Sequence, residues 1–409
     1  MSRHNYLNVN SKYVVWHNLS CHNPPMARRR VVNPFRFGPL ALDEAFTDRQ
    51  AELDSLVTDA RNGQDVVVFA PRRYGKSSLV WRMAQELIKE DVLVAQVDLM
   101  RTPTKDQLAA KLARTIHEEL ASRLWNAKER LKVFAGLRLN PTITVNPNDG
   151  SVSFSFDARA AEQDIDATLE ELLTMLGRIA ADRDRRVVLV LDEFQEIVDI
   201  DPGLIKLMRS VFQEQPEVAH IYLGSKRHMM RQIFNDENEP FWRSAKQTEL
   251  DVIPPDLFAP YARARFDETG KELHADACQM ALELTGGHPY ATQELLYFLW
   301  EGTAPGGVAD VSAMDGALDA TLRSEHSHFS LIWDGVSGAQ KRVLQALAQD
   351  QPARPLSSDY QRRHSLPATP TVQGALKALE RGELVRRLGR GEYRIAEPFL
   401  TQWIQRYET

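Results

Sequence analysis

The stretch "VVVFAPRRYGKSSLV", Val66 to Val80, sets the first element of the fold. Its β-branched apolar residues predict a buried strand, and the spacing of Leu79, Met83 and Leu87 predicts a helix after it. The letters between them match the phosphate-binding pattern G-x-x-x-x-G-K-[ST], except that Ala70 stands in the first glycine position. Strand, loop and helix in this order can direct backbone N–H groups at a phosphate.

The residues of this loop supply the chemistry that a nucleotide needs. Gly75 allows the turn, Lys76 can meet the β- and γ-phosphates, and Ser77 can coordinate Mg²⁺. The first position requires a small residue, which alanine satisfies. We expect nucleotide contacts along the whole loop, from Ala70, Pro71, Arg72, Arg73, Tyr74, Gly75, Lys76, Ser77 and Ser78. A chance G-K-S at an exposed turn is the alternative.

Two adjacent arginines, Arg72 and Arg73, lie inside the loop. Both cannot point inward, because neighbouring side chains of a loop diverge. They either supply charge to the phosphates or face water.

A second motif, "VVLVLDEFQEI" (187–197), predicts a buried strand that ends in two carboxylates. Acids at the carboxyl end of such a strand lie in the crevice where α/β sheets bind ligands. Asp192 can hold Mg²⁺ through water, while Glu193 orients and activates the attacking water. Alone, an Asp-Glu pair after a strand is often a solvated turn. Combined with Lys76 and Ser77, it predicts nucleotide hydrolysis.

The next strand, "HIYLG", is followed by Ser225. Its hydroxyl can reach the γ-phosphate or the attacking water from the neighbouring sheet position. Capping of the following helix explains a serine here equally well.

Composition places the chain among globular proteins of two or three domains, with 409 residues, 43% hydrophobic and 26% charged. It has no apolar run long enough to cross a bilayer, which excludes an integral membrane protein. Two cysteines exclude a disulfide framework and favour a cytoplasmic location. The first 25 residues show no periodicity and predict an unstructured tail, with Met26 as the expected true start.

Strands alternate with helices up to about residue 253, which predicts an α/β P-loop NTPase core with a parallel sheet. We expect a tail over 1–32, the core over 33–253 with a β-hairpin insertion near 137–157, a helical lid over 254–320 and a winged-helix domain over 321–409. A single long helix is expected from Thr104, as its N-cap, to Trp125. Residues 254–302 read as helical only, and 302–320 as a looser stretch.

Six stretches, taken together, resemble the archaeal-type ATPase family. They are "FTDRQAEL" (46–53), "APRRYGKSSL", "VLDEFQEI", "LGSKRHMM", "PFWRSAKQTEL" and "TGGHPYATQELL". That family belongs to the STAND branch of the AAA-like P-loop ATPases and is distantly similar to Cdc6-type origin-recognition initiators. The resemblance covers about Asn33 to Tyr407.

The resemblance also implies roles for single residues. Asp48 and Arg49 match the element that helps to hold adenine, and Pro289 lies in the G-x-P element, from Gly287, that closes over the nucleotide. Arg243 falls where the family has a γ-phosphate sensor or arginine finger, although an ordinary surface arginine fits too. The lid lacks the arginine that initiator-type proteins use as a second sensor.

The C-terminal region predicts three helices and a two-stranded wing, and it is the basic part of a chain of net charge −6. From Gly338 to Thr409 there are 12 Lys or Arg against 7 Asp or Glu. The third helix and the wing offer Lys377, Arg381, Arg386, Arg387 and Arg390. This face could meet DNA phosphates, or it could pack on the ATPase body or a protein partner.

The sequence therefore predicts an ATP-binding and slowly ATP-hydrolysing molecular switch that uses ATP and Mg²⁺. A protein partner or self-association through the lid and winged helix is expected. An ATP-gated DNA-binding protein of initiator or mobile-element type is one alternative. An ATP-binding scaffold with negligible turnover is another.

Overall fold

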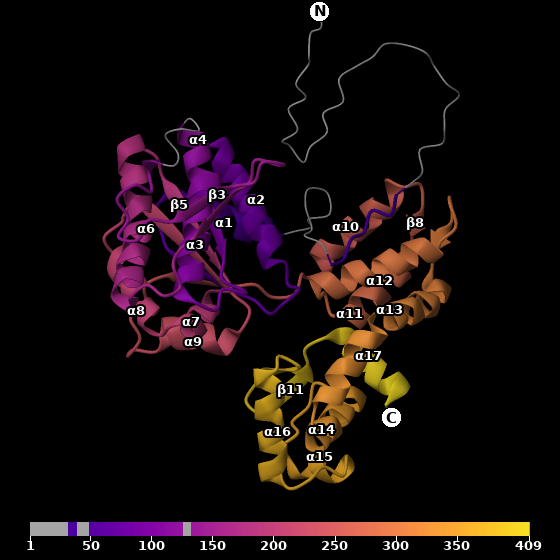
Figure 1. The fold of residues 1–409 in the computed structure, drawn as a ribbon. Coiled ribbons are helices and arrows are strands. Elements are labelled where there is room, and N and C mark those ends of the chain that lie inside the picture. The colour runs from indigo at the N-terminus through magenta and orange to yellow at the C-terminus, as the bar shows by residue number, and fades with distance from the viewer. Residues whose placement is uncertain (1–31, 39–48, 126–131, 409) are drawn as a thin grey trace, which may run out of the picture. The chain divides into compact units, whose positions relative to one another are not determined.

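A five-stranded sheet carries the loops that the sequence singles out (Figure 1). Its strands run in the order β2 (Leu93–Asp98), β5 (Val187–Asp192), β6 (Val218–Gly224), β1 (Val66–Phe69) and β7 (Lys246–Glu249). β2 pairs in parallel with β5, and β1 in parallel with β7. The Val- and Leu-rich strands β1 and β5 are buried almost throughout, as parallel strands covered on both faces are. The parallel α/β sheet expected from the sequence is confirmed.

The computed structural model describes residues 32–38, 49–125 and 132–408. The predicted tail, apart from Val32, and the predicted adenine contact Asp48 lie outside the described residues. The described chain forms two compact units, residues 90–221 and residues 32–89 together with 222–409. Each unit is built around its own buried side chains.

The first unit packs helices against β2 and β5. The long helix predicted from Thr104 is instead three segments, α3 (Lys105–Thr115), a π-helical turn (Ile116–Ala121) and α4 (Ser122–Leu124). Thr104 does occupy the N-cap position, but its side chain makes no capping hydrogen bond. The π-helical turn packs on β2, where its residue Glu119 accepts a hydrogen bond from the Gln96 backbone N–H at 2.7 Å.

The remaining elements of this unit surround the second motif. The strands β3 (Thr142–Val145) and β4 (Val152–Ser155) pair antiparallel within the region for which the sequence predicts an inserted hairpin. Helix α6 (Glu162–Arg183) leads into β5, after which come a 3₁₀ turn (Phe194–Glu196), α7 (Ile197–Ile200) and α8 (Gly203–Phe212).

The second unit begins with α1 (Gln50–Arg61), β1 and α2 (Lys76–Lys89), and returns with α9 (Arg227–Asn235) and β7. Helices α10 (Pro255–Asp267), α11 (Ala275–Thr285), α12 (Pro289–Gly302) and α13 (Met314–Gly335) follow. The prediction that this stretch is helical only was wrong, because β8 (Glu272–Leu273) pairs with β9 (Val308–Ala309). Residues 302–320 are also more ordered than expected, because α13 starts at Met314 after a 3₁₀ turn (Val311–Ala313).

The winged helix consists of α14 (Gly338–Gln349), α15 (Ser358–Arg363), α16 (Thr369–Arg381) and the antiparallel strands β10 (Val385–Gly389) and β11 (Glu392–Ile395). A fourth helix, α17 (Pro398–Tyr407), was not predicted. The expected boundary at residue 320 falls inside α13, whose buried Phe329 and Trp333 lie in one apolar cluster with Trp403 of α17. Lid and winged helix therefore share a core.

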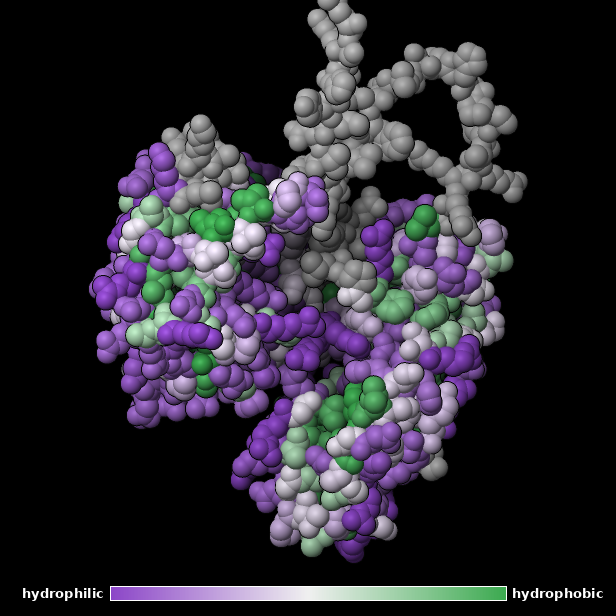
Figure 2. Space-filling model, viewed as in Figure 1, coloured by the Kyte–Doolittle hydropathy of each residue, from purple (hydrophilic) through white to green (hydrophobic). Residues whose placement is uncertain are grey.

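The outer surface is mostly polar. Figure 2 shows hydrophilic residues over most of the visible face, with hydrophobic ones in small groups. Among the described residues, no helix combines the length and the apolar character that a membrane span requires.

The junction between β7 and α12 brings two backbone stretches unusually close. Gly287 has φ +70°, its carbonyl accepts a hydrogen bond from the Ile253 N–H at 2.9 Å, and a Cβ added to it would lie 2.2 Å from the Ile253 carbonyl oxygen. Only glycine fits such an approach. Its neighbour Gly286 also has positive φ, but a Cβ there would meet nothing within 4 Å.

This difference predicts unequal effects of two alanine substitutions. Gly286→Ala should cost about 1 kcal/mol, the usual penalty of a left-handed residue with a Cβ. Gly287→Ala should cost clearly more, because the clash must also displace Ile253 and weaken its hydrogen bond. Urea unfolding of both variants measures the difference. Equal losses would show that this close approach does not exist in solution.

Candidate functional site

The phosphate-loop motif connects the end of β1 to the start of α2. Ala70 is fully buried, and its N–H donates to the Gly224 carbonyl at 3.3 Å. A small side chain is what this buried position admits, so alanine can replace the glycine of the pattern. Gly75, at φ +84°, turns the chain into the helix.

Lys76, the first residue of α2, turns its side chain back over the loop. Its Nζ donates to the carbonyl of Ala70 at 2.7 Å and to that of Pro71 at 3.2 Å. The residue is only 7% exposed. Ser77 and Ser78 follow in the first turn of the helix, with Ser78 buried and Ser77 partly exposed. The ammonium is thus held at the loop, where the sequence places the phosphates.

The three residues in the middle of the loop have different surroundings. Arg72 and Arg73 are both exposed, but Arg73 also contacts Tyr290 of α12 and Glu325 of α13. Tyr74 is buried, and its ring meets the ring of His288 edge-on, with centroids 4.7 Å apart. Tyr74 is therefore a packing residue between the loop and the start of α12.

Arg49 braces the loop and does not point into open space. It is 4% exposed, and its guanidinium donates to Glu52 and to the carbonyls of Tyr74 and Asp251. The predicted contact of Arg49 with adenine stays a prediction, and within the chain its donors are engaged by these three groups.

The G-x-P element begins α12 at Pro289. The residue before it, His288, is the N-cap, and its Nδ1 accepts a hydrogen bond from the Ala291 N–H at 3.3 Å. Burial, with the nearby charge of Arg73, lowers the pKa of His288 to about 3, so the ring is neutral at neutral pH. The element thus lies at the Tyr74 side of the phosphate loop.

In the first unit, Asp192 ends β5 and Glu193 follows in a left-handed conformation, φ +53°. Asp192 Oδ1 accepts the Glu193 N–H at 2.9 Å, and the carboxylate of Glu193 accepts from Gln195 Nε2 at 2.5 Å. Gln195 is completely buried. It fixes the direction of the Glu193 side chain, and sequence reasoning missed it because the motif gives no reason to single out a glutamine two residues on.

Ser225 follows β6 and is fully buried. The N-cap of α9 is the next residue, Lys226. Since the preceding residue Gly224 accepts the Ala70 N–H, Ser225 lies beside the start of the phosphate loop. The predicted contact of its hydroxyl with the γ-phosphate or the attacking water stays a prediction, as does the capping alternative.

Arg243 lies at the wrong end of the sheet for a contact with the phosphate loop of its own chain. It precedes β7, whose first residue Lys246 pairs with Val66 at the start of β1. The loop follows the other end of β1, after Phe69. Arg243 is exposed and its guanidinium lies 5.5 Å from the ring centroid of Trp242. A role as γ-phosphate sensor within one chain is not supported, and an arginine finger here would have to reach a second chain.

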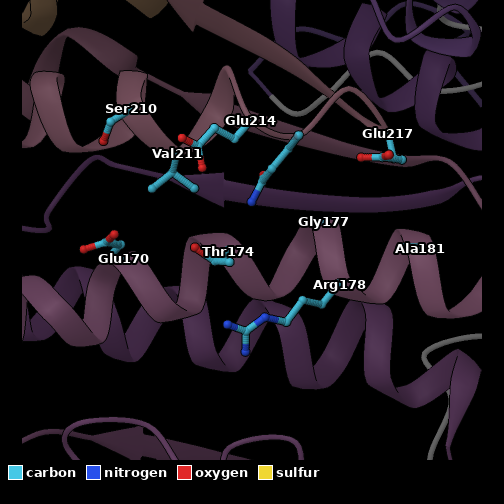
Figure 3. Close-up of a pocket in the computed structure, with 10 residues that line it drawn as sticks. Glu170, Thr174, Gly177, Arg178, Ala181, Ser210, Val211, Glu214 and Glu217 are labelled. Carbon is cyan, nitrogen blue, oxygen red and sulfur yellow. The ribbon is translucent and has the colours of Figure 1, made fainter.

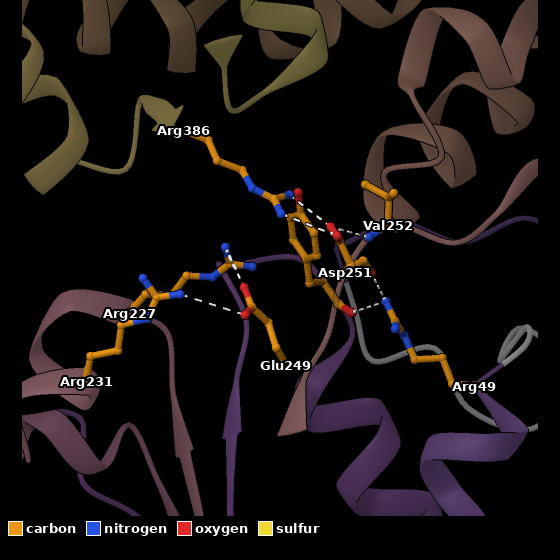
Figure 4. A network of polar contacts seen from close by, with 8 residues as sticks. Arg49, Arg227, Arg231, Glu249, Asp251, Val252 and Arg386 are labelled. Atoms are coloured by element: carbon orange, nitrogen blue, oxygen red, sulfur yellow. Dashed lines mark hydrogen bonds and ion pairs between the residues drawn. The ribbon is translucent and has the colours of Figure 1, made fainter. Parts of the chain in front are cut away.

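A network of charged residues that the sequence did not reveal lies around Glu249 and Asp251 (Figure 4). Arg227 of α9 pairs with Glu249 at 2.9 Å, and Arg386 of the wing holds both oxygens of Asp251 at 2.9 and 3.3 Å. The Arg386 guanidinium keeps the pKa of Asp251 below its usual range. Burial lowers the pKa of Arg227, whose Nε and one Nη find no hydrogen-bond partner among the described residues.

This network engages one residue of the basic face predicted for the winged helix and leaves the others exposed. Arg386 is used within the chain, on Asp251. Four of its predicted members remain exposed: Lys377, Arg381, Arg387 and Arg390.

A pocket elsewhere in the first unit lies between α6 and α8 (Figure 3). Its charged lining residues are Glu170, Arg178, Glu214 and Glu217. None of the motif residues lines it, and its mixture of acids and one arginine favours no particular ligand.

The fold and the loop chemistry define a P-loop ATPase core followed by a winged helix. A family model described as "ATPase domain predominantly from Archaea" matches residues 46–295, and one described as "Probable winged helix domain" matches residues 327–406. Because the first match covers more than half of the chain, the protein belongs to this ATPase domain family. The resemblance seen in the sequence is confirmed.

Solved structures show the same fold. The Walker-type ATPase PABY2304 of Pyrococcus abyssi has a TM-score of 0.64 at 17% identity, over 91% of this chain and 99% of that chain. Aeropyrum pernix ORC1 in complex with DNA has a TM-score of 0.46 at 13% identity, over 89% and 94%. The Thermotoga maritima RuvB branch migration motor has a TM-score of 0.42 at 12% identity, over 90% and 98%. These identities speak for the fold alone, and the last two are too distant to support an argument. No curated protein sequence matches the chain.

Next to the loop, three carboxyl groups come together from three helical elements. They belong to Glu294 of α12, Glu325 of α13 and Glu397, the N-cap of α17. Glu294 is fully buried, and its burial together with Glu325 and Glu397 raises its pKa to about 9. Burial likewise raises the pKa of Glu397 to about 7. Glu294 is therefore protonated at neutral pH.

This raised pKa predicts a pH-dependent stability. The folded chain keeps a proton on Glu294 that the unfolded chain releases above about pH 4.5, so this stabilisation is full at low pH and is lost as pH rises towards 9. Glu294→Gln should flatten the fall in thermal midpoint between pH 5 and 9. Glu380→Gln, which changes an exposed carboxylate of α16, should not. Parallel curves for Glu294→Gln and wild type would contradict the assignment.

Proposed function

We propose that the protein binds ATP with Mg²⁺, hydrolyses it slowly and acts as a nucleotide-dependent switch of the STAND or AAA-like class. The observation that carries the proposal is the loop itself: a buried lysine held over the turn between a buried strand and a helix N-terminus. Membership of the ATPase family supports it. The proposal includes a cytoplasmic location.

The charges around the loop suit an anionic ligand. Arg49, Arg227, Arg386 and Arg394 all come from elements near Tyr74, against the carboxylates Glu249 and Asp251. Two buried N–H donors of Arg227 remain unsatisfied, and an unmade hydrogen bond at a buried donor is costly. A polyphosphate near the loop would lower that cost. Lys76 would then exchange loop carbonyls for phosphate oxygens.

The hydrolytic roles are assigned to the residues of the second motif. Asp192 and Ser77 carry the oxygen ligands that Mg²⁺ prefers, and a bound Mg²⁺ would neutralise phosphate charge. Glu193, with its side chain directed by Gln195, is the proposed base for the attacking water. Its left-handed backbone is the kind of local strain that functional positions retain. Ser225 is proposed to contact the γ-phosphate or that water.

Two substitutions separate an enzyme from a scaffold. Lys76→Ala should weaken ATP binding strongly, because it removes the charge that meets the phosphates. Glu193→Gln should bind ATP normally but release phosphate about 10²- to 10⁴-fold more slowly, as expected on loss of a general base. Equilibrium binding of a fluorescent ATP analogue and phosphate release with Mg²⁺ measure the two effects.

Matched controls for these variants lie on the same elements. Lys89→Ala changes an exposed lysine at the far end of α2, and Asp199→Asn an exposed carboxylate of α7. Both should behave as wild type. If Glu193→Gln turns over as fast as wild type, Glu193 is not the base. If wild type binds ATP without measurable turnover, only the scaffold alternative remains.

A second candidate function is ATP-gated binding of DNA. The exposed basic residues of α16 and the wing favour it, because cations on a recognition helix and wing can contact DNA phosphates. A protein partner, or a second copy of the chain, at the lid and winged helix is the competing use of the same surface.

The DNA candidate makes a salt-dependent prediction. A short duplex should bind in the micromolar range or tighter, and the affinity should fall steeply as salt rises. The double variant Arg387→Ala/Arg390→Ala should weaken binding and reduce the salt slope. The control Arg362→Ala/Arg363→Ala removes two exposed arginines that are already paired with Asp359 and Asp350. No binding by wild type at low salt, with or without ATP, would eliminate this candidate.

A further inference from the structure

Arg73 leaves the phosphate loop to contact two residues of the helices that follow the core. Its guanidinium lies 4.2 Å from the centroid of the Tyr290 ring, and its Nη1 lies 3.6 Å from Glu325 Oε2. The hydroxyl of Tyr290 donates to the other oxygen of Glu325 at 3.0 Å. The three side chains therefore form a closed set, with each one in contact with the other two.

The backbone of Arg73 is in the left-handed region, at φ +67°. A residue with a Cβ pays for this conformation, so contacts of its side chain have to offset the cost. The Arg73 side chain is 34% exposed, while the Glu325 side chain is 9% exposed. The pair is thus partly shielded from water and salt, yet open enough to exchange for another partner.

Three acidic side chains lie near the one arginine that faces them. Glu325 is accompanied by Glu294 and Glu397, and the charge of Arg73 opposes the rise in the pKa of both. Arg73 is therefore the nearby cation that makes this group of acids tolerable. The other polar groups that face it are His288, kept neutral by burial, and Tyr290.

Glu325 is next in sequence to a residue that contacts the winged helix. The next residue along α13, His326, accepts a hydrogen bond from Trp403 Nε1 of α17 at 3.0 Å. The buried side chains Phe329 and Trp403 belong to the same core. A displacement of Glu325 can therefore alter the packing between α13 and α17, because the adjacent residue takes part in it.

In this contact the charges are placed the other way round from those of a second-sensor arginine, which lies in the lid. Here the loop provides the cation and α13 provides the acid. We propose that Glu325, supported by Tyr290, holds Arg73 away from the phosphates of a bound nucleotide, that these phosphates compete for Arg73, and that its release loosens α13 against the winged helix. This mechanism rests on the proposed nucleotide binding and adds the route by which binding would be transmitted. A ligand can shift a conformational equilibrium only through contacts that differ between the two states, and Arg73 supplies such a contact.

The test compares two variants whose effects should differ in sign. Glu325→Gln removes the competitor, so ADP and a slowly hydrolysed ATP analogue should bind about two- to fivefold tighter, the range expected for a partly exposed ion pair. Arg73→Ala removes the group that the phosphates recruit, so both nucleotides should bind more weakly. Equilibrium binding to the full chain measures both.

A second readout separates coupling from simple affinity. In wild type, nucleotide should accelerate amide hydrogen exchange in α13 around Glu325 and in α17. In both variants that exchange should already be fast without nucleotide and should change little when nucleotide is added. Asp334→Asn, which alters an exposed carboxylate at the far end of α13, should respond as wild type.

The outcomes distinguish this inference from the function on which it rests. If wild type binds no nucleotide, the proposed function falls and this inference with it. If wild type binds but Glu325→Gln binds no tighter, or Arg73→Ala keeps the nucleotide-dependent exchange in α13, the inference alone is overturned. Tyr290→Phe, which removes one hydrogen bond, should shift the nucleotide affinity in the same direction as Glu325→Gln, by a smaller factor. It replaces Glu325→Gln in the test if that variant does not fold.

Discussion

Two buried cations hold the phosphate loop in shape. Lys76 donates to the carbonyls of Ala70 and Pro71, and Arg49 donates to those of Tyr74 and Asp251. A buried charge is tolerated only where polar groups surround it, so these carbonyl oxygens have to face the cations. The geometry of the loop depends on this arrangement more than on the missing first glycine.

Local sequence patterns predicted the elements that depend on local interactions. The strand before Ala70, the strand ending at Asp192 and the three helices and wing of the winged helix follow from period and turn chemistry, and the structure contains them. Local patterns could not show what depends on pairing between distant segments. Arg243 precedes a core strand as expected, but the parallel register of Lys246 with Val66 puts it at the end of the sheet opposite to the loop.

The same reason explains the residues that sequence analysis missed. Arg227 lies inside a quoted motif, yet only its partner Glu249, which is distant in sequence, gives it a role. Gln195 contacts Glu193 two residues away, and only the fold shows that it is completely buried. The family resemblance implies a contact of Arg49 with adenine, and only the fold shows that the buried guanidinium also donates to the Asp251 carbonyl. A charged residue's type says that it needs a partner, and only the fold says which partner it has.

The winged helix is tied to the rest of its unit by contacts of very different strength. The pairs Arg386–Asp251 and Arg73–Glu325 are partly exposed, and pairs of this kind contribute about 0.2–1 kcal/mol each. The apolar contacts of α13 with α17, through Phe329 and Trp403, are fully buried and much more costly to break. A ligand at the loop can therefore exchange the ion pairs but cannot detach the domain. Any signal that leaves the loop has to travel as a small displacement of α13 with the winged helix still attached to it.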